Sequence, residues 1–187
     1  MAVKQRMPGL FGFSEQMILD GVFFMKKILS IILIMIMVLA LAGCGNQTPQ
    51  EIVSEELNLA ISGGAQISAS DTHGGFHGDG ITYIVLQFDD NAVLGAIEKD
   101  PRWTAFPLDE STQTLVYGAE AEAGQIGPFF SDGQGNALIP EIQNGYYILI
   151  DRHADTDTDI LERYSFNFTV GLYDTDHNIL YFGKMDT

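Results

Sequence analysis

Two histidines and two aspartates occur close together in residues 71–80, which read DTHGGFHGDG. Imidazole nitrogens and carboxylate oxygens are common ligands of Zn²⁺ and related divalent ions. Four glycines argue against a helix here, and in a straight strand residues i and i+4 stand about 13 Å apart, too far for one ion. We therefore interpret the segment as a bent loop that binds a divalent metal, with His73 and His77 as nitrogen ligands. Asp71 or Asp79 would supply an oxygen ligand or orient a histidine.

The same segment has a simpler interpretation, as a glycine-rich connection whose polar side chains bond to neighbouring backbone groups. Motifs of well-known enzyme classes are missing from the sequence: it contains no G-x-S-x-G elbow, no G-x-x-x-x-G-K-[ST] loop and no H-E-x-x-H. The sequence therefore favours a protein that is not an enzyme. A metal-binding protein, or a small metal-dependent hydrolase that uses the 71–80 loop, is the alternative.

A second acidic segment, residues 151–159, places aspartates at alternate positions in a way that suggests calcium binding. Counting the EF-hand template from Asp155 puts Ile160 where glycine is needed and Phe166 where glutamate is needed, so the template fails. We expect a solvated loop between two apolar strands instead. Trp103 and Phe106 are expected to be core or lid residues rather than a ligand cage.

Cys44, the one cysteine of the chain, lies at the end of a signal-like region. Lys26 and Lys27 precede an apolar run of 15 residues, 28–42, which is interrupted only by Ser30. A helix needs about 20 apolar residues to cross a bilayer, so this run is short for a permanent anchor and is typical of a signal peptide. With its cysteine used in this region, the rest of the chain can form no disulfide.

The sequence Leu41-Ala42-Gly43-Cys44 resembles the lipobox of bacterial lipoproteins. That resemblance implies that the Cys44 thiol is diacylated and that the chain is cleaved just before it. Two or more acyl chains would hold the protein firmly on a membrane. Segments 71–80, 144–153 (NGYYILIDRH) and 172–187 (LYDTDHNILYFGKMDT) are similar to those of a family of small uncharacterised lipoproteins, and this resemblance carries no known activity.

These features predict how the chain is divided. Residues 1–24 are expected to be a mis-called extension in front of Met25, and residues 25–43 a lipoprotein signal peptide. Residues 44–50 would form the lipidated cysteine and a short tether, and residues 51–187 a single acidic globular domain. The expected location is the cell membrane or cell envelope, lipid-anchored on the extracytoplasmic side.

Removing residues 1–43 makes the chain strongly acidic. It takes away four of the nine Lys and Arg residues and two of the 25 Asp and Glu residues, which changes the net charge from −16 to −18. Such a surface repels the phosphates of nucleic acids, so we expect no nucleic acid partner. It attracts basic proteins and divalent cations. We therefore expect a non-enzymatic binding or interaction module with a basic protein partner.

The pattern of apolar residues predicts an α+β domain. Short aromatic and β-branched runs separated by turn residues indicate a mainly antiparallel sheet of about six strands, with the clearest at 81–88, 113–118, 146–151, 164–173 and 179–184. The strands at 146–151 and 164–173 are expected to pair. Residues 174–178 should form the turn of a C-terminal β-hairpin, and alternation within 164–173 suggests that one face of that strand is buried.

One helix is expected from about residue 90 to residue 99, where Val93, Leu94 and Ile97 form an apolar stripe. Asp89 or Asp90 could cap its first turn, and Pro101 would end it. We expect this single helix to cover one face of the sheet.

Overall fold

The computed structural model of the 187-residue chain describes residues 26–27, 32, 47–61, 63–74, 78–121 and 124–187. The chain divides into two units, Met1–Asn46 and Gln47–Thr187. The predicted lipobox, Leu41–Cys44, lies outside the described residues. Within the part that is described, no helix has the length and apolar character needed to cross a membrane.

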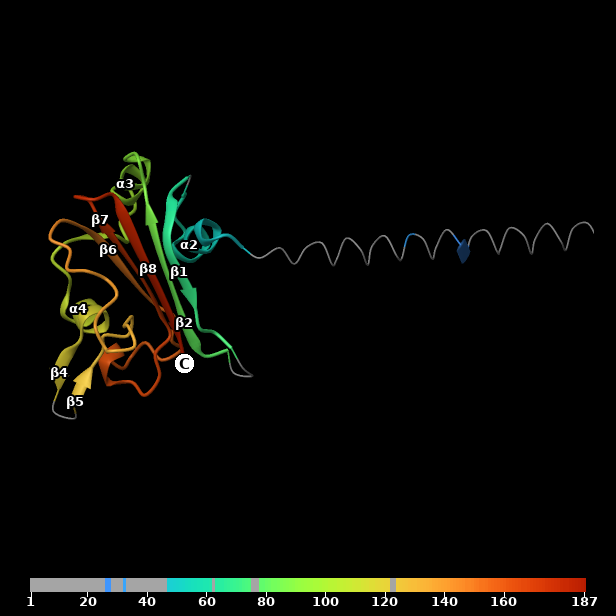
Figure 1. The fold of residues 1–187 in the computed structure, drawn as a ribbon. Coiled ribbons are helices and arrows are strands. Elements are labelled where there is room, and N and C mark those ends of the chain that lie inside the picture. Colours follow the sequence, from blue (N-terminus) through green and yellow to red (C-terminus); the bar gives the residue numbers. More distant parts are fainter. Residues whose placement is uncertain (1–25, 28–31, 33–46, 62, 75–77, 122–123) are drawn as a thin grey trace, which may run out of the picture. The chain divides into compact units, whose positions relative to one another are not determined.

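The second unit is an α+β domain built on a six-stranded antiparallel sheet (Figure 1). Its sheet order is β1-β2-β8-β7-β6-β3, and β4 and β5 form a separate two-stranded ribbon. The helices are α2 (Pro49–Leu57), α3 (Ala92–Ile97), α4 (Glu110–Tyr117) and the 3₁₀ helix η1 (Ile160–Glu162). The strands are β1 (Ala65–Asp71), β2 (Gly80–Gln87), β3 (Thr104–Ala105), β4 (Ala119–Ala121), β5 (Gly124–Ile126), β6 (Gly145–Asp151), β7 (Phe168–Asp174) and β8 (Ile179–Asp186).

The predicted C-terminal hairpin is confirmed as β7 and β8, and the predicted pairing of 146–151 with 164–173 is confirmed as β6 with β7. The hairpin turn is held by Asp174, whose carboxylate accepts hydrogen bonds from the backbone N–H groups of Asp176 and His177. Asn178 closes the turn with a φ of 55°, a conformation that asparagine adopts more readily than most residues. The turn chemistry therefore sets the register of the hairpin.

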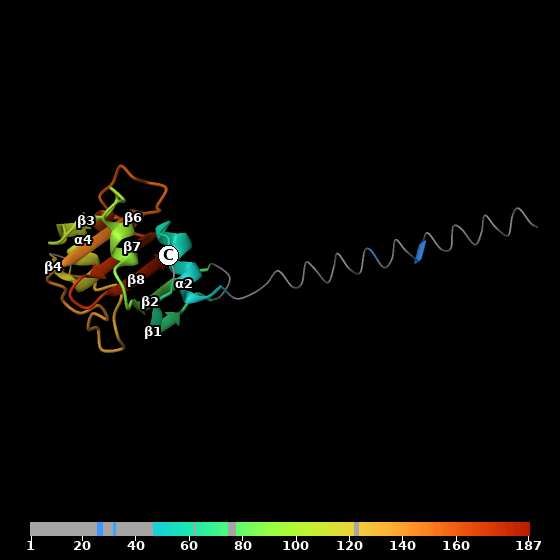
Figure 2. The ribbon, with the colours of Figure 1, turned by 90° about the horizontal axis from the view of Figure 1, so that it is seen from above.

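Both faces of the sheet are buried, whereas the sequence suggested one. On one face α2 and α3 cover Ile84, Leu86 and Tyr173. On the other face α4 and the segment around Phe130 cover Val170 and neighbouring side chains of β2, β7 and β8. Seen from above, α2 and α4 lie on opposite sides of the sheet (Figure 2). The central strand β7 is consequently buried at every position.

Glycines allow two aromatic rings to lie directly on the central strands. On one face Trp103 contacts Gly171, where an added Cβ would lie 2.8 Å from the indole. On the other face the ring of Phe130 fills the space beside Gly183. On each face of the sheet, one aromatic ring thus packs against a glycine. Trp103 is a core residue, as expected, with 7% of its surface exposed.

The prediction of a strand at 113–118 was wrong, because this segment belongs to helix α4. Asp109 caps the helix by accepting a hydrogen bond from the N–H of Thr112 at 2.7 Å. Thr112, Leu115 and Val116 then face the core at helical spacing. The cap and this stripe outweigh the high β-propensity of the sequence QTLVY.

The prediction of a helix at 90–99 is confirmed by α3, although the described part of the domain contains three α-helices rather than one. Asp90 accepts a hydrogen bond from the N–H of Ala92, next to the helix start. Helix α2 begins at a capping box in which the side chains of Thr48 and Glu51 each accept a hydrogen bond from the other's backbone N–H. Its first residue, Pro49, falls within the segment expected to be the tether.

Strand β1 forms one edge of the sheet and is exposed along its whole length. A β-bulge between Gln66 and Ser68 interrupts its pairing with β2. Ile67, at this bulge, is 55% exposed. The opposite edge is closed by the two-residue strand β3.

Candidate functional site

The predicted metal loop connects β1 to β2. Asp71 ends β1, and His73 follows it with two hydrogen bonds to the Asp71 carboxylate, at 2.9 Å from its backbone N–H and 2.5 Å from Nδ1. The other ring nitrogen, Nε2, lies 3.1 Å from the carboxylate of Asp186 at the end of β8. Both nitrogens of His73 therefore face carboxylate oxygens, so a metal could bind the ring only by displacing one of them.

His77 lies outside the described residues, and Asp79 is exposed. Within the described ranges, no group of three or more His, Cys, Asp or Glu side chains could hold a metal ion. The structure brings Asp71 and His73 together and adds Asp186, which the sequence reasoning did not include. The metal site of Asp71, His73, His77 and Asp79 stays a prediction.

Asp186 is the centre of a larger cluster of charges. Arg152 lies 2.7 Å from its carboxylate and Lys184 lies 3.9 Å from it, while Lys184 also contacts Glu56 of α2 at 2.6 Å. We call the six residues Glu56, Asp71, His73, Arg152, Lys184 and Asp186 the Asp186 network. It joins helix α2, strands β1 and β8 and the residue that follows β6.

The network favours the charged forms of its two aspartates. The backbone N–H of His73 is the main cause that lowers the pKa of Asp71. Burial opposes ionisation of Asp186, but the hydrogen bonds and positive charges of Arg152 and its neighbours outweigh burial and lower its pKa. These carboxylates are used to connect elements of the fold.

The aspartate-rich segment 151–159 begins at the last residue of β6, and its remainder lies in the connection between β6 and β7, as expected. Asp155 accepts hydrogen bonds from the N–H of Asp157 and from both the N–H and hydroxyl of Thr158, and these bonds lower its pKa. Asp159 caps η1. One guanidinium nitrogen of Arg163 donates to both carboxylate oxygens of Asp151, at 2.8 and 2.9 Å. Most of these aspartates therefore shape the loop itself.

A shallow depression of about 520 Å³ lies between this loop and the start of α4. Its acidic lining includes Asp109, which caps α4, and Asp151, which pairs with Arg163. Asp157 also lines it and is exposed. Arg163 thus supplies a positive charge inside the same depression.

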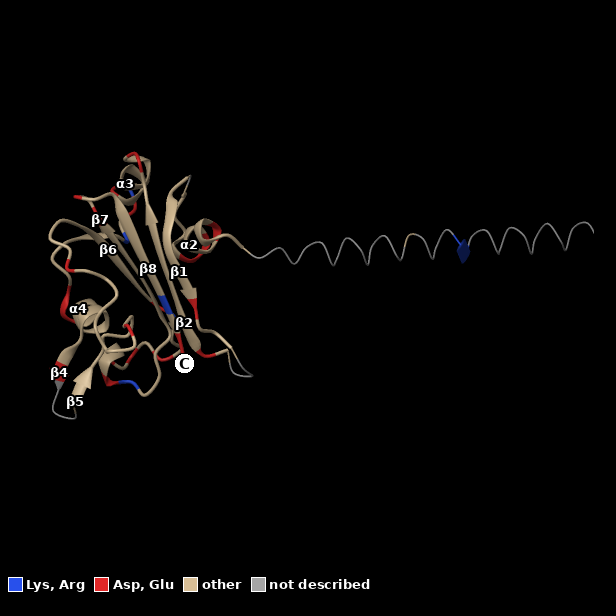
Figure 3. Ribbon diagram, viewed as in Figure 1, with Lys and Arg blue, Asp and Glu red and all other residues tan. Residues whose placement is uncertain are grey.

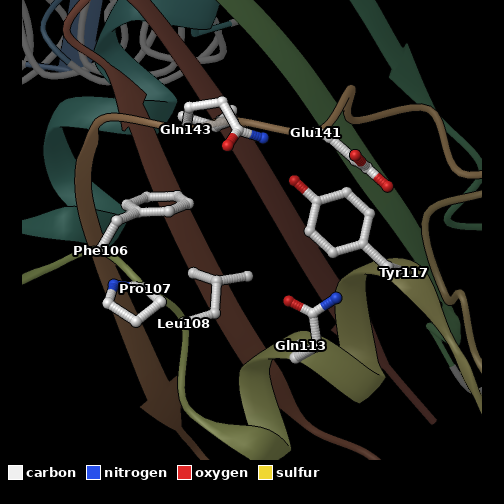
Figure 4. Close-up of a pocket in the computed structure, with 8 residues that line it drawn as sticks. Phe106, Pro107, Leu108, Gln113, Tyr117, Glu141 and Gln143 are labelled. Carbon is white, nitrogen blue, oxygen red and sulfur yellow. The ribbon is translucent and has the colours of Figure 1, made fainter.

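A second hollow, of about 390 Å³, lies beside the edge strand β3 and helix α4 (Figure 4). We call it the Glu141 groove. It is lined by Phe106, Pro107, Leu108, Gln113, Tyr117, Glu141, Ile142 and Gln143. Figure 4 shows the rings of Phe106 and Tyr117 on opposite sides of the hollow, with Glu141 and Gln143 above and Gln113 below.

Both aromatic walls of the groove are held in place by the fold. The ring of Phe106 packs edge-on against the ring of Tyr147, with centroids 6.0 Å apart. The backbone N–H of Phe106 donates a 3.0 Å hydrogen bond to the carbonyl of Gly145. The hydroxyl of Tyr117 donates a 2.7 Å hydrogen bond to the carbonyl of Pro140. Ile142, which also lines the groove, is buried. The groove is therefore preformed.

The electrostatics of the groove are set by one carboxylate. Glu141 is exposed and forms no ion pair with any residue that the structure describes. Burial raises the pKa of Tyr117 to about 12, and the negative charge of Glu141 adds to this rise. Tyr117 therefore stays neutral near pH 7 and presents an aromatic face next to an uncompensated negative charge.

Sequence reasoning missed this groove. Phe106, expected to be a core or lid residue, is partly buried against the core and also forms one wall of the hollow. The other lining residues come from three segments and share no motif, so only the fold brings them together. The available signals were weak: an aromatic residue directly before a proline, and a glutamate that follows Pro140.

Comparison with known proteins gives no relative for this chain: no family model, no curated protein and no solved structure matches it.

Proposed function

We propose that this protein is a lipid-anchored, extracytoplasmic binding module that captures a basic protein partner at the cell membrane or envelope. The anchor part of the proposal rests on the sequence around Cys44. The binding part rests on the charge of the domain and on the presence of a preformed groove.

The observation that carries the binding proposal is how the domain uses its few positive charges. Residues 47–187 contain 23 acidic and five basic residues. Four of the five form ion pairs with carboxylates of the same domain: Arg102, Arg152, Arg163 and Lys184. Figure 3 shows acidic residues spread over the domain and few basic ones.

Nearly all of the charge left to interact with a partner is therefore negative. A field of this sign speeds up encounters with positively charged proteins and opposes association with anionic ones. The attraction between exposed charges is screened by salt, over about 10 Å at 0.1 M. Binding to a basic partner should accordingly weaken as the salt concentration rises.

The binding proposal is tested with the full-length chain, solubilised in a mild non-ionic detergent, and two hexapeptides used as probes. We expect hexa-arginine to bind at about 50 mM NaCl and to bind much more weakly at about 300 mM, whereas hexa-glutamate does not bind at either. Calorimetry or fluorescence anisotropy provides the dissociation constants. Equal binding of the two peptides, or binding of neither, contradicts the proposal.

The anchor is tested independently with Cys44→Ser. The parent chain, expressed in a bacterium, should incorporate labelled palmitate and sediment with membranes. The variant should do neither. A variant that is labelled and fractionated like the parent would rule out Cys44 as the lipidated residue.

A further inference from the structure

We propose that the Glu141 groove receives an arginine or lysine side chain of the basic partner. The inference rests on the proposed function and adds the place at which a partner residue would bind. A long cationic side chain has an apolar stem and a charged head, and the groove offers complementary surfaces for both.

The walls of the groove suit the stem and the flat face of such a side chain. Leu108 and Ile142 provide apolar contacts, and the rings of Phe106 and Tyr117 stand on either side of the hollow. A cation over the face of a tyrosine or phenylalanine ring is attracted by the ring's negative face. Since both rings are fixed by contacts with Tyr147 and Pro140, they lose little freedom on binding.

The rim of the groove suits the charged head. Glu141 supplies a carboxylate without a partner among the described residues. Gln113 and Gln143 bring amide oxygens that can accept hydrogen bonds from a guanidinium or ammonium group. A volume of about 390 Å³ holds one long side chain together with its adjoining backbone.

The depression near the aspartate-rich loop is a weaker competitor for the same ligand. It is more acidic in composition, but Arg163 already lies in it and pairs with Asp151. A partner cation would have to compete with that internal arginine. No arginine or lysine is among the described residues that line the Glu141 groove.

The test measures binding of hexa-arginine to full-length charge variants at about 50 mM NaCl, an ionic strength at which exposed charges are only partly screened. Glu141→Gln should weaken binding about three- to fivefold. Glu162→Gln, which removes an exposed charge outside both hollows, is the matched control. Asp157→Asn tests the competing depression. Both should bind within about twofold of the parent, because each removes a single remote charge.

Adding a negative charge to the groove should have the opposite effect on hexa-arginine binding. Gln143→Glu adds a carboxylate of the same shape to the groove and should tighten binding about threefold. Gln125→Glu places the same change on the exposed strand β5 and should have less effect. Phe106→Leu keeps an apolar side chain but removes an aromatic face, and should weaken binding about two- to fivefold.

The outcomes separate the two proposals. If the parent chain does not bind hexa-arginine, the proposed function fails and the groove assignment fails with it. If the parent binds but Glu141→Gln matches its Glu162→Gln control, or Asp157→Asn has the larger effect, only the groove assignment is overturned. Binding that Phe106→Leu leaves unchanged also overturns it. Thermal unfolding of each variant shows that the fold is retained.

Discussion

In the Asp186 network each carboxylate contacts a basic side chain, whereas in the Glu141 groove the carboxylate lies beside Tyr117 and is exposed to solvent. The network joins helix α2 to both β1 and β8, so its charges hold elements of the fold together. The groove is built by packing that does not involve Glu141. In this acidic domain, charges that the fold gathers from distant parts of the sequence thus contribute to stability, whereas we propose that an isolated charge serves recognition.

Removing the charge of Asp186, the centre of the network, is expected to have the largest effect on the stability of the fold. Asp186→Asn leaves Arg152, Lys184 and His73 without their shared carboxylate, although Arg152 keeps hydrogen bonds to Phe168 and Met185 carbonyls. We expect the free energy of unfolding to fall by about 1–2 kcal/mol, less than for a fully buried ion pair because the side chains are about one-quarter exposed. Urea denaturation measures this. A loss equal to that of Glu162→Gln would show that the network does not stabilise the fold.

The pH dependence of stability should report on the same network. Asp71 and Asp186 have pKa values below the usual 3.8, so they bind protons less readily in the folded chain than in the unfolded one. Their contribution is present above that value and is lost as the pH falls through the lower, folded pKa values. Urea denaturation between about pH 5 and pH 2.5 should show a falling stability whose slope is shallower in Asp186→Asn. Identical slopes would contradict the prediction.

The Asp186 network, which contains His73, should respond little to divalent metal. Because both nitrogens of His73 face carboxylates, we expect the chain, purified without chelator, to carry no stoichiometric metal and Zn²⁺ to shift its melting temperature by less than about 1 °C. Native mass spectrometry and thermal unfolding provide the measurements. A metal that is present in the parent and missing from the His73→Ala/His77→Ala variant would establish the predicted loop site instead.

The smallest effect on stability is expected for a substitution in the groove. Glu141→Gln removes an exposed side chain's charge without breaking an ion pair, so the free energy of unfolding should change by no more than about 0.5 kcal/mol. Urea denaturation under the conditions used for Asp186→Asn allows direct comparison. A destabilisation as large as that of Asp186→Asn would remove the distinction between the two regions.

Much of the sheet could be predicted because its signals are local. Short aromatic and β-branched runs marked β2, β6, β7 and β8, and the Asp174–Asn178 turn marked the hairpin. Strand β1 could not be found in this way, because it is exposed throughout and forms through pairing with β2. Helix α2 did leave a signal that was overlooked: Thr48 and Glu51 have capping-box spacing, with Pro49 at the first helical position.

The candidate sites show a similar division. The 71–80 loop could be named from its residue types, but its long-range partner Asp186 lies 113 positions from His73 and became visible only in the fold. The Glu141 groove depends on side chains from the segment after β3, from helix α4 and from the segment before β6. None of these segments contains a motif or a cluster of reactive residues from which the groove could be predicted.

The bulge in β1 bears on how copies of the protein behave when they are crowded. When copies of a protein meet at high local concentration, an open and regular sheet edge is a template for edge-to-edge polymerisation. The bulge between Gln66 and Ser68 breaks that regularity at the position of exposed Ile67. The acidic charge shared by all copies adds repulsion at close approach. An edge blunted in this way should lower the tendency of crowded copies to pair through their sheets.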